Sequence, residues 1–132
     1  MTEVTEAARM PFAATSARFV MTLQVAFAVV GFSLYGFAII TGGLFELAPI
    51  LYFAIGVAFI VLLGRLAGRW HSRLRRVRWA TVALEIVIAM GLVVVQAVDP
   101  GLSVGGLIGA TVCPAAVVVL TLVPATGRWF DR

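Results

Sequence analysis

Glu85 is the residue best placed to carry chemistry, because it is an acidic side chain within a long apolar segment. It lies about 9 Å along a helix from Trp79, where that segment begins. A carboxylate this deep in a bilayer costs a few kcal/mol, so it must face protein or water, bind a proton or pair with a cation. Two interpretations follow: a proton- or cation-binding group of a small transporter or channel, or a polar contact that holds helices together.

The neighbours of Glu85 at helical spacing are also polar. Arg78, Thr81 and Gln96 fall with it in a stripe roughly 90° wide on one helix face. Gln24 lies at nearly the same depth in the first apolar segment, so we expect it to be the partner from another helix. The predicted intramembrane polar site therefore consists of Glu85, Gln24, Thr81, Gln96 and Arg78.

Other residue types that commonly carry catalysis are scarce in this chain. It has one histidine, His71, and one cysteine, Cys113. One histidine cannot provide bis-histidine haem ligation, and one cysteine makes neither a dithiol nor a zinc site. No nucleophile–base pair can be assembled from this set. The sequence predicts no catalytic residues, no metal and no cofactor, and a protein that is not an enzyme.

Small residues mark helix faces that can pack closely, because backbones approach each other where no large side chain intervenes. The last apolar segment carries such a face, with a GxxxG pattern from Gly105 to Gly109. We expect these contacts within the chain, and an interface between copies is the alternative. The residues expected to make them are Gly105, Gly106, Gly109, Cys113, Gly31 and Gly56.

Composition indicates what holds these residues in place. The chain has 132 residues, 62% hydrophobic and 12% charged, which is too few polar groups to coat a water-soluble domain. We predict an all-α integral membrane protein, a four-transmembrane-helix bundle with up-down-up-down topology. Its transmembrane domain covers residues 18–127, between an interfacial lead (1–17), in which Pro11 ends a short helix, and a cytoplasmic tail (128–132). The expected spans are 18–41, 48–67, 79–98 and 102–123, each about 20 residues as a bilayer requires, the last ending at Pro124.

The charges predict an orientation. All ten basic residues are arginines on one side of this map, whereas Glu46 and Asp99 occupy the two turns on the other side. Positively charged short loops stay in the cytoplasm, so both termini are expected there, in a plasma or inner cell membrane. This bias explains the net charge of +4 without nucleic acid, and it excludes transporters that insert in both orientations. The central loop is expected to contact anionic lipid head groups or an acidic partner, through Arg65, Arg69, Arg73, Arg75, Arg76 and Arg78.

Two hairpins with similar ends suggest a parallel repeat. Arg18 and Arg78 open the first and third spans, and Gly-Arg-Trp closes the second and fourth, at 68–70 and 127–129. Two hairpins that follow the same course would be related by an axis along the membrane normal. The alternative is that an arginine beside an aromatic residue is common at any cytoplasmic helix end.

The topology is similar to that of small bacterial four-span membrane proteins, without a resemblance at the level of residues. Helix-packing faces without a catalytic set favour a non-enzymatic accessory, assembly or regulatory subunit that works through helix–helix contacts. Its partners would be the lipid bilayer and a larger membrane-protein complex or other copies of itself. The alternative function is a proton- or cation-linked small transporter or channel that uses the intramembrane Glu85.

Overall fold

The computed structural model describes residues 9–98 and 104–130, apart from the side chains at positions 106, 107, 109 and 110. Every regular element in that part of the chain is helical. The order is α2 (Phe12–Gly42), α3 (Leu47–Arg69), the 3-10 turn η1 (Trp70–Ser72), α4 (Arg75–Val98), α5 (Val104–Leu122) and α6 (Pro124–Phe130). The predicted all-helical class is therefore confirmed for the described residues.

The first long helix begins earlier than expected. Pro11 has an extended backbone with ψ of 150° and immediately precedes α2, which starts at Phe12 rather than at Arg18. Proline fixes φ and is tolerated at a helix start, where an N–H has no partner in any case. Pro11 therefore lies at the start of a helix, and the short helix expected before it falls mostly on residues 1–8, outside the described residues. Ala14 and Ala17, assigned from sequence to the interfacial lead, are buried.

The connection between α2 and α3 is a tight turn. Gly43 follows α2 in the left-handed conformation, with φ of 66°, and its N–H bonds to the carbonyl of Ile39. Glycine suits this position because it has no Cβ to clash there.

The C-terminal end of α3 continues past the expected boundary to Arg69 and then into η1. The helix therefore extends by more than a turn into the arginine-rich segment.

The C-terminal end differs from the expected tail. Pro124 ends α5 as predicted, but the chain then turns by 69° into α6, which contains Gly127 and Arg128. Trp129 and Phe130 are buried rather than part of a solvated tail. These two side chains are apolar, so their burial in the core favours the position of α6 across the junction.

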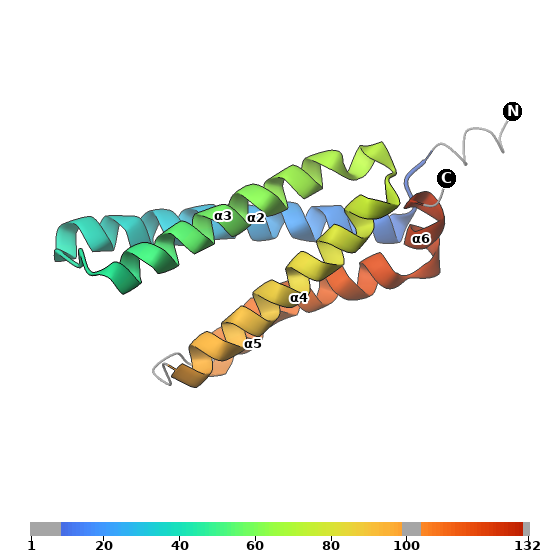
Figure 1. Cartoon of the computed structure of the whole chain (residues 1–132). Helices are drawn as coiled ribbons and strands as arrows, with labels where there is room; N and C mark the ends of the chain where they lie inside the picture. Colours follow the sequence, from blue (N-terminus) through green and yellow to red (C-terminus); the bar gives the residue numbers. More distant parts are fainter. Residues whose placement is uncertain (1–8, 99–103, 131–132) are drawn as a thin grey trace, which may run out of the picture.

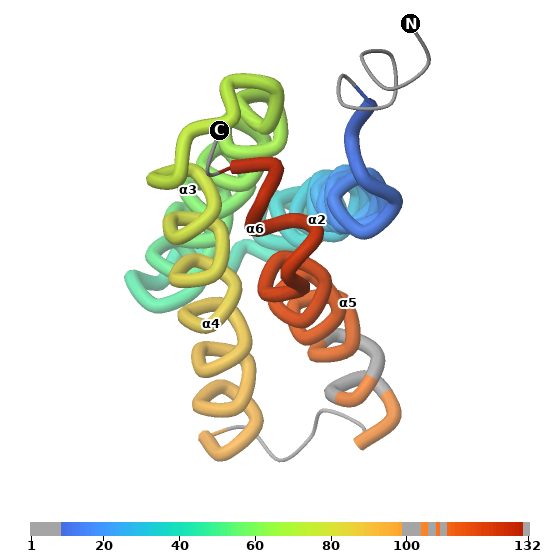
Figure 2. The backbone as a smooth tube through the Cα atoms, turned by 90° about the vertical axis from the view of Figure 1, so that its right-hand side faces the viewer, coloured from blue at the N-terminus to red at the C-terminus, as the bar shows by residue number. Residues whose placement is uncertain are grey.

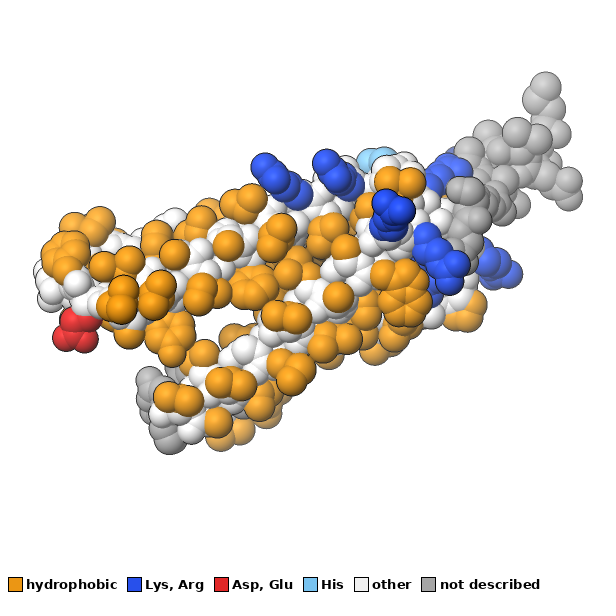
Figure 3. Space-filling model, in the orientation of Figure 1, with side chains coloured by type: hydrophobic (Ala, Val, Ile, Leu, Met, Phe, Trp, Pro, Cys, Tyr) orange, Lys and Arg blue, Asp and Glu red, His pale blue; other side chains and the backbone are white. Residues whose placement is uncertain are grey.

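Two helical hairpins make up the molecule. Figure 1 shows α2 beside α3 and α4 beside α5, with the hairpins meeting at the end where α6 lies and diverging away from it. In Figure 2 the same junction is seen end-on, with α6 lying across the ends of the helices. Arginine side chains gather at this junction, and an acidic side chain lies at the far end of the α2–α3 hairpin (Figure 3).

The buried core lies at the junction. Residues from α2, α3, η1, α4, α5 and α6 meet there: Ala14, Ala17, Met21, Leu63, Trp70, Val77, Val117, Trp129 and Phe130. Beyond it, large apolar side chains along both hairpins are exposed. Within the described residues, three helices are long and apolar enough to cross a membrane, and a fourth crossing is counted if the bent pair Thr111–Leu122 and Pro124–Phe130 is one span.

Glycine contacts hold α2 against α3. The ring of Phe32 lies where a Cβ on Gly56 would be, and a Cβ on Gly36 would come within 2.9 Å of the Phe53 ring. Each helix thus receives a phenylalanine of the other on a glycine, and the two rings are 6.2 Å apart. Gly56 is a packing residue as expected, whereas Gly36 was not identified from the sequence.

The other glycines of the predicted packing set lie differently. A Cβ on Gly31 or Gly105 would meet nothing within 4 Å, so neither glycine packs against a described side chain of this chain. Cys113 is half-buried on α5. Gly106 and Gly109 fall on α5 outside the described side chains. The face that these residues share remains a prediction.

Candidate functional site

A polar contact joins the two hairpins within their apolar surfaces. Glu85 of α4 is 0% exposed, and the Nε2 atom of Gln24 in α2 donates a hydrogen bond of 3.2 Å to its Oε2 atom. Because α2 and α4 belong to different hairpins, this bond ties one hairpin to the other. The structure thus brings together the two residues that were predicted to pair because they lie at similar depths in their apolar segments.

Two buried oxygen atoms remain beside this bond. Glu85 Oε1 and Gln24 Oε1 have no hydrogen-bond donor among the described residues. A buried polar atom without a partner costs about 1–3 kcal/mol, so such atoms are rare in stable proteins. A protonated carboxyl is itself a donor, and a small cation is attracted to two oxygens at once. The arrangement can therefore hold a proton or a cation, or serve only to join helices.

The other members of the predicted polar stripe point to different partners. Thr81 is buried, but its hydroxyl donates to the Val77 carbonyl of its own helix over 2.8 Å. The Nε atom of Arg78 donates to the Thr121 carbonyl in α5 over 3.1 Å. Gln96 lies half-buried on α4, near the far end of that helix. Of the expected partners of Glu85, the structure therefore gives it Gln24.

The role of Arg78 follows from the helix break at Pro124. An unbroken helix would pair the carbonyl of Leu120 with the N–H of residue 124, which proline lacks. The Thr126 hydroxyl donates to that Leu120 carbonyl instead, over 2.8 Å, while the Thr121 carbonyl receives the Arg78 bond. Two carbonyl groups at the end of α5 are thus satisfied by side chains, one of them from α4.

Aromatic contacts hold α6 over the junction. The rings of Trp70 in η1 and Phe130 in α6 meet edge to face, with centroids 5.3 Å apart. The guanidinium carbon of Arg73 lies 3.9 Å from the centroid of the Trp129 ring, a cation–π geometry. The sequence carried a signal for this cluster in its two Gly-Arg-Trp segments, whose tryptophans both enter the core. From the sequence, these segments indicated only a hairpin repeat or ordinary cytoplasmic helix ends.

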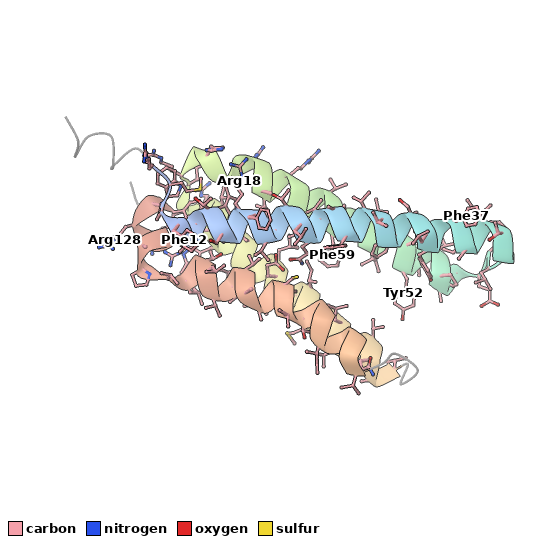
Figure 4. All side chains as sticks on the ribbon, turned by 180° about the vertical axis from the view of Figure 1, so that it is seen from behind. Phe12, Arg18, Phe37, Tyr52, Phe59 and Arg128 are labelled. Carbon is pink, nitrogen blue, oxygen red and sulfur yellow. The ribbon has the colours of Figure 1, made fainter. Side chains whose placement is uncertain are left out.

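The arginines divide into structural and exposed groups. Arg73 and Arg78 are half-buried in the contacts just described, and Arg18 donates to the Nε2 atom of His71 over 2.7 Å. The remaining arginines of the central segment are exposed: Arg65, Arg69, Arg75 and Arg76. Figure 4 shows Arg18 and Arg128 at the same end of the molecule, far from Phe37 and Tyr52. Only part of the arginine set predicted for lipid or partner contact is therefore on the surface.

Within the described residues, no three His, Cys, Asp or Glu side chains come together as metal ligands. The polar groups that the structure brings together are the Glu85 carboxyl and the Gln24 amide. No protein family model matches this chain, and no curated protein or solved structure is significantly similar to it.

Proposed function

We propose that this chain is a four-span protein of a plasma or inner cell membrane, and a non-enzymatic accessory, assembly or regulatory subunit of a larger membrane complex. In this proposal α2, α3, α4 and the bent pair α5–α6 each cross the bilayer, in up-down-up-down order. The three long apolar helices and the bent pair support the crossings. The arginines at the junction support cytoplasmic termini, because positively charged short segments are retained on that side.

The divergence of the hairpins is the observation that carries the proposal. The core lies at the junction, and beyond it each hairpin contributes helix faces that the other does not cover. Tyr52 is 54% exposed, and it projects from α3 on the side of the α4–α5 hairpin (Figure 4). A transmembrane helix of a partner protein placed between the diverging hairpins would bury these faces.

Gly31 supports a contact of that kind. It lies seven residues after Gln24, so the two share a face of α2 to within about 20°. That face makes the Gln24–Glu85 bond and continues as Gly31, where an added Cβ would meet nothing within 4 Å. In lipid, close approach at small residues drives helix association, because lipid is as apolar as the helix surfaces.

Purification of the full chain in a mild detergent, followed by measurement of the particle mass, tests the proposal. We expect the chain in a particle heavier than the monomer, with one distinct membrane protein in a fixed ratio. A particle built only of copies of this chain would contradict the accessory role and favour a homo-oligomer. A monomer that carries lipid and detergent alone would contradict helix-mediated assembly.

A second candidate function, a proton- or cation-linked transporter, is favoured by the two buried oxygens of Glu85 and Gln24 that have no donor among the described residues. A group that binds and releases a proton or cation needs such an acceptor in a protected place. Flux into vesicles that contain the purified chain tests this function. Loss of flux in a Glu85→Gln variant that folds normally would support transport, and the absence of flux in the unchanged chain would contradict it.

A further inference from the structure

An apolar groove runs between α3 and α4 near the junction. Its volume is about 360 Å³, and it is lined by Leu62, Leu66, Ala80, Ala83, Leu84 and Val87. Leu66 and Leu84 are half-buried, whereas the other four side chains are exposed. The groove is therefore open to the surroundings of the protein, and small alanine side chains on α4 leave room in it.

Two arginines follow the lining residues of this groove in helical register, toward the charged end. On α3, Arg69 follows Leu62 by seven residues and lies within about 40° of the middle of the lining face. On α4, Arg76 precedes Ala80 by four residues and lies within about 30° of the middle of the lining face. Both arginines are exposed, and α3 and α4 are joined by the short segment between them.

We propose that this groove binds one anionic phospholipid, with an acyl chain along the apolar lining and the phosphate between Arg69 and Arg76. An apolar groove that ends at two cations matches a molecule with an acyl chain below an anionic head group. The two acidic side chains in the described residues do not neutralise the arginines, because Glu46 precedes α3 at the far end and Glu85 is buried. The inference rests on the proposed membrane location, not on the accessory role.

Native mass spectrometry of the full chain in detergent, with added lipid, tests the site. The probes are phosphatidylglycerol and phosphatidylcholine with identical acyl chains. Arg69→Gln combined with Arg76→Gln removes the head-group contacts, and Ala83→Phe fills the groove while it keeps both arginines. The matched controls are Arg9→Gln combined with Arg128→Gln, which removes the same charge from exposed positions, and Ala115→Phe, at an exposed position of α5.

We expect one phosphatidylglycerol to be retained in preference to phosphatidylcholine, with an affinity that falls roughly tenfold or more in the Arg69–Arg76 double variant. Ala83→Phe should reduce retention of the same lipid, and both controls should keep it. Equal losses in the two double variants would show general charge attraction and overturn the site. Full retention in Ala83→Phe would overturn the acyl-chain position. Alkaline extraction of cell membranes tests the membrane location separately. An integral membrane protein stays in the membrane pellet, whereas release of the chain would show that the proposed membrane location is wrong.

Discussion

Gln24 Nε2 donates a 3.2 Å hydrogen bond to the fully buried Glu85 Oε2, and this bond links α2 of one hairpin to α4 of the other. The faces of α2 and α4 that hold this bond continue along both helices toward the end where the hairpins diverge (Figure 1). The bond can therefore set the angle between the hairpins as well as hold them together. Substitutions at its two ends should separate a joining role from a binding role.

Glu85→Gln should leave the fold intact. The new amide can accept from Gln24 Nε2 and can also donate to Gln24 Oε1, which has no donor among the described residues of the unchanged chain. Glu85→Leu removes the acceptor, buries the Gln24 amide without a partner and should cost about 1–2 kcal/mol. Thermal unfolding in detergent, followed by circular dichroism, measures both variants. Equal loss of stability in the two would argue against the hydrogen bond as the joining element.

Gly56→Ala should destabilise the α2–α3 hairpin, because the Phe32 ring occupies the place of the added methyl group. Overpacking of this kind costs about 1–3 kcal/mol. Gly64→Ala on the same helix is the matched control, since its Cβ would meet nothing within 4 Å. The apparent unfolding temperature in detergent should fall for Gly56→Ala and stay unchanged for the control. A similar change in both would contradict the described contact.

Arg78→Ala should loosen α6. It removes the donor to the Thr121 carbonyl, and hydrogen bonds from charged groups contribute about 1.5–3 kcal/mol. Arg76→Ala removes the same charge from an exposed position and should change stability little. Amide hydrogen exchange of residues 121–130 reports on the end of α5 and on α6. Faster exchange in this segment is expected for Arg78→Ala alone, and unchanged protection in that variant would contradict the assigned role.

Reporter fusions test the orientation of the spans. A reporter fused after Arg132 or inserted near His71 should be cytoplasmic, and one inserted at Gly43 or Gly101 should be external. The physical reason is the position of the arginines, which resist transfer across the membrane in short loops. An external signal after Arg132 would contradict the four-span topology.

The all-helical class and the three long apolar helices could be predicted from the sequence, because long apolar segments separated by glycine, proline and charge leave few alternatives. The pairing of Glu85 with Gln24 was also accessible, since depth in each segment follows from helical rise. The 69° turn at Pro124 and the folding of α6 onto Trp70 were not, because a short apolar tail and a solvated tail are hard to distinguish by composition. The same limit applies to Arg78, whose partner is the Thr121 carbonyl at the end of a helix more than forty residues later.

It is equally hard to predict from the sequence which helix faces are covered by another helix. Gly56 and Gly31 are both glycines within long apolar segments, so the sequence pattern does not distinguish them. In the structure the Phe32 ring lies against Gly56, whereas a Cβ added to Gly31 would meet nothing within 4 Å. Which glycine is covered depends on the crossing of α2 and α3 and on where the second hairpin departs. Those are properties of tertiary packing, and no local sequence feature encodes them.

Site-directed photocrosslinking from the faces between the hairpins tests most directly the claim that this chain works through contacts with a partner helix. The photoreactive side chain replaces Tyr52 on α3 or Leu92 on α4, which lies seven residues after Glu85 on nearly the same face. The matched controls are Ile50 and Val94, exposed residues about 160° around the same helices. We predict that Tyr52 and Leu92 give the same protein adduct in cell membranes and that Ile50 and Val94 do not give it. Adducts to lipid alone from all four positions, or the same protein adducts from the controls, would contradict the claim.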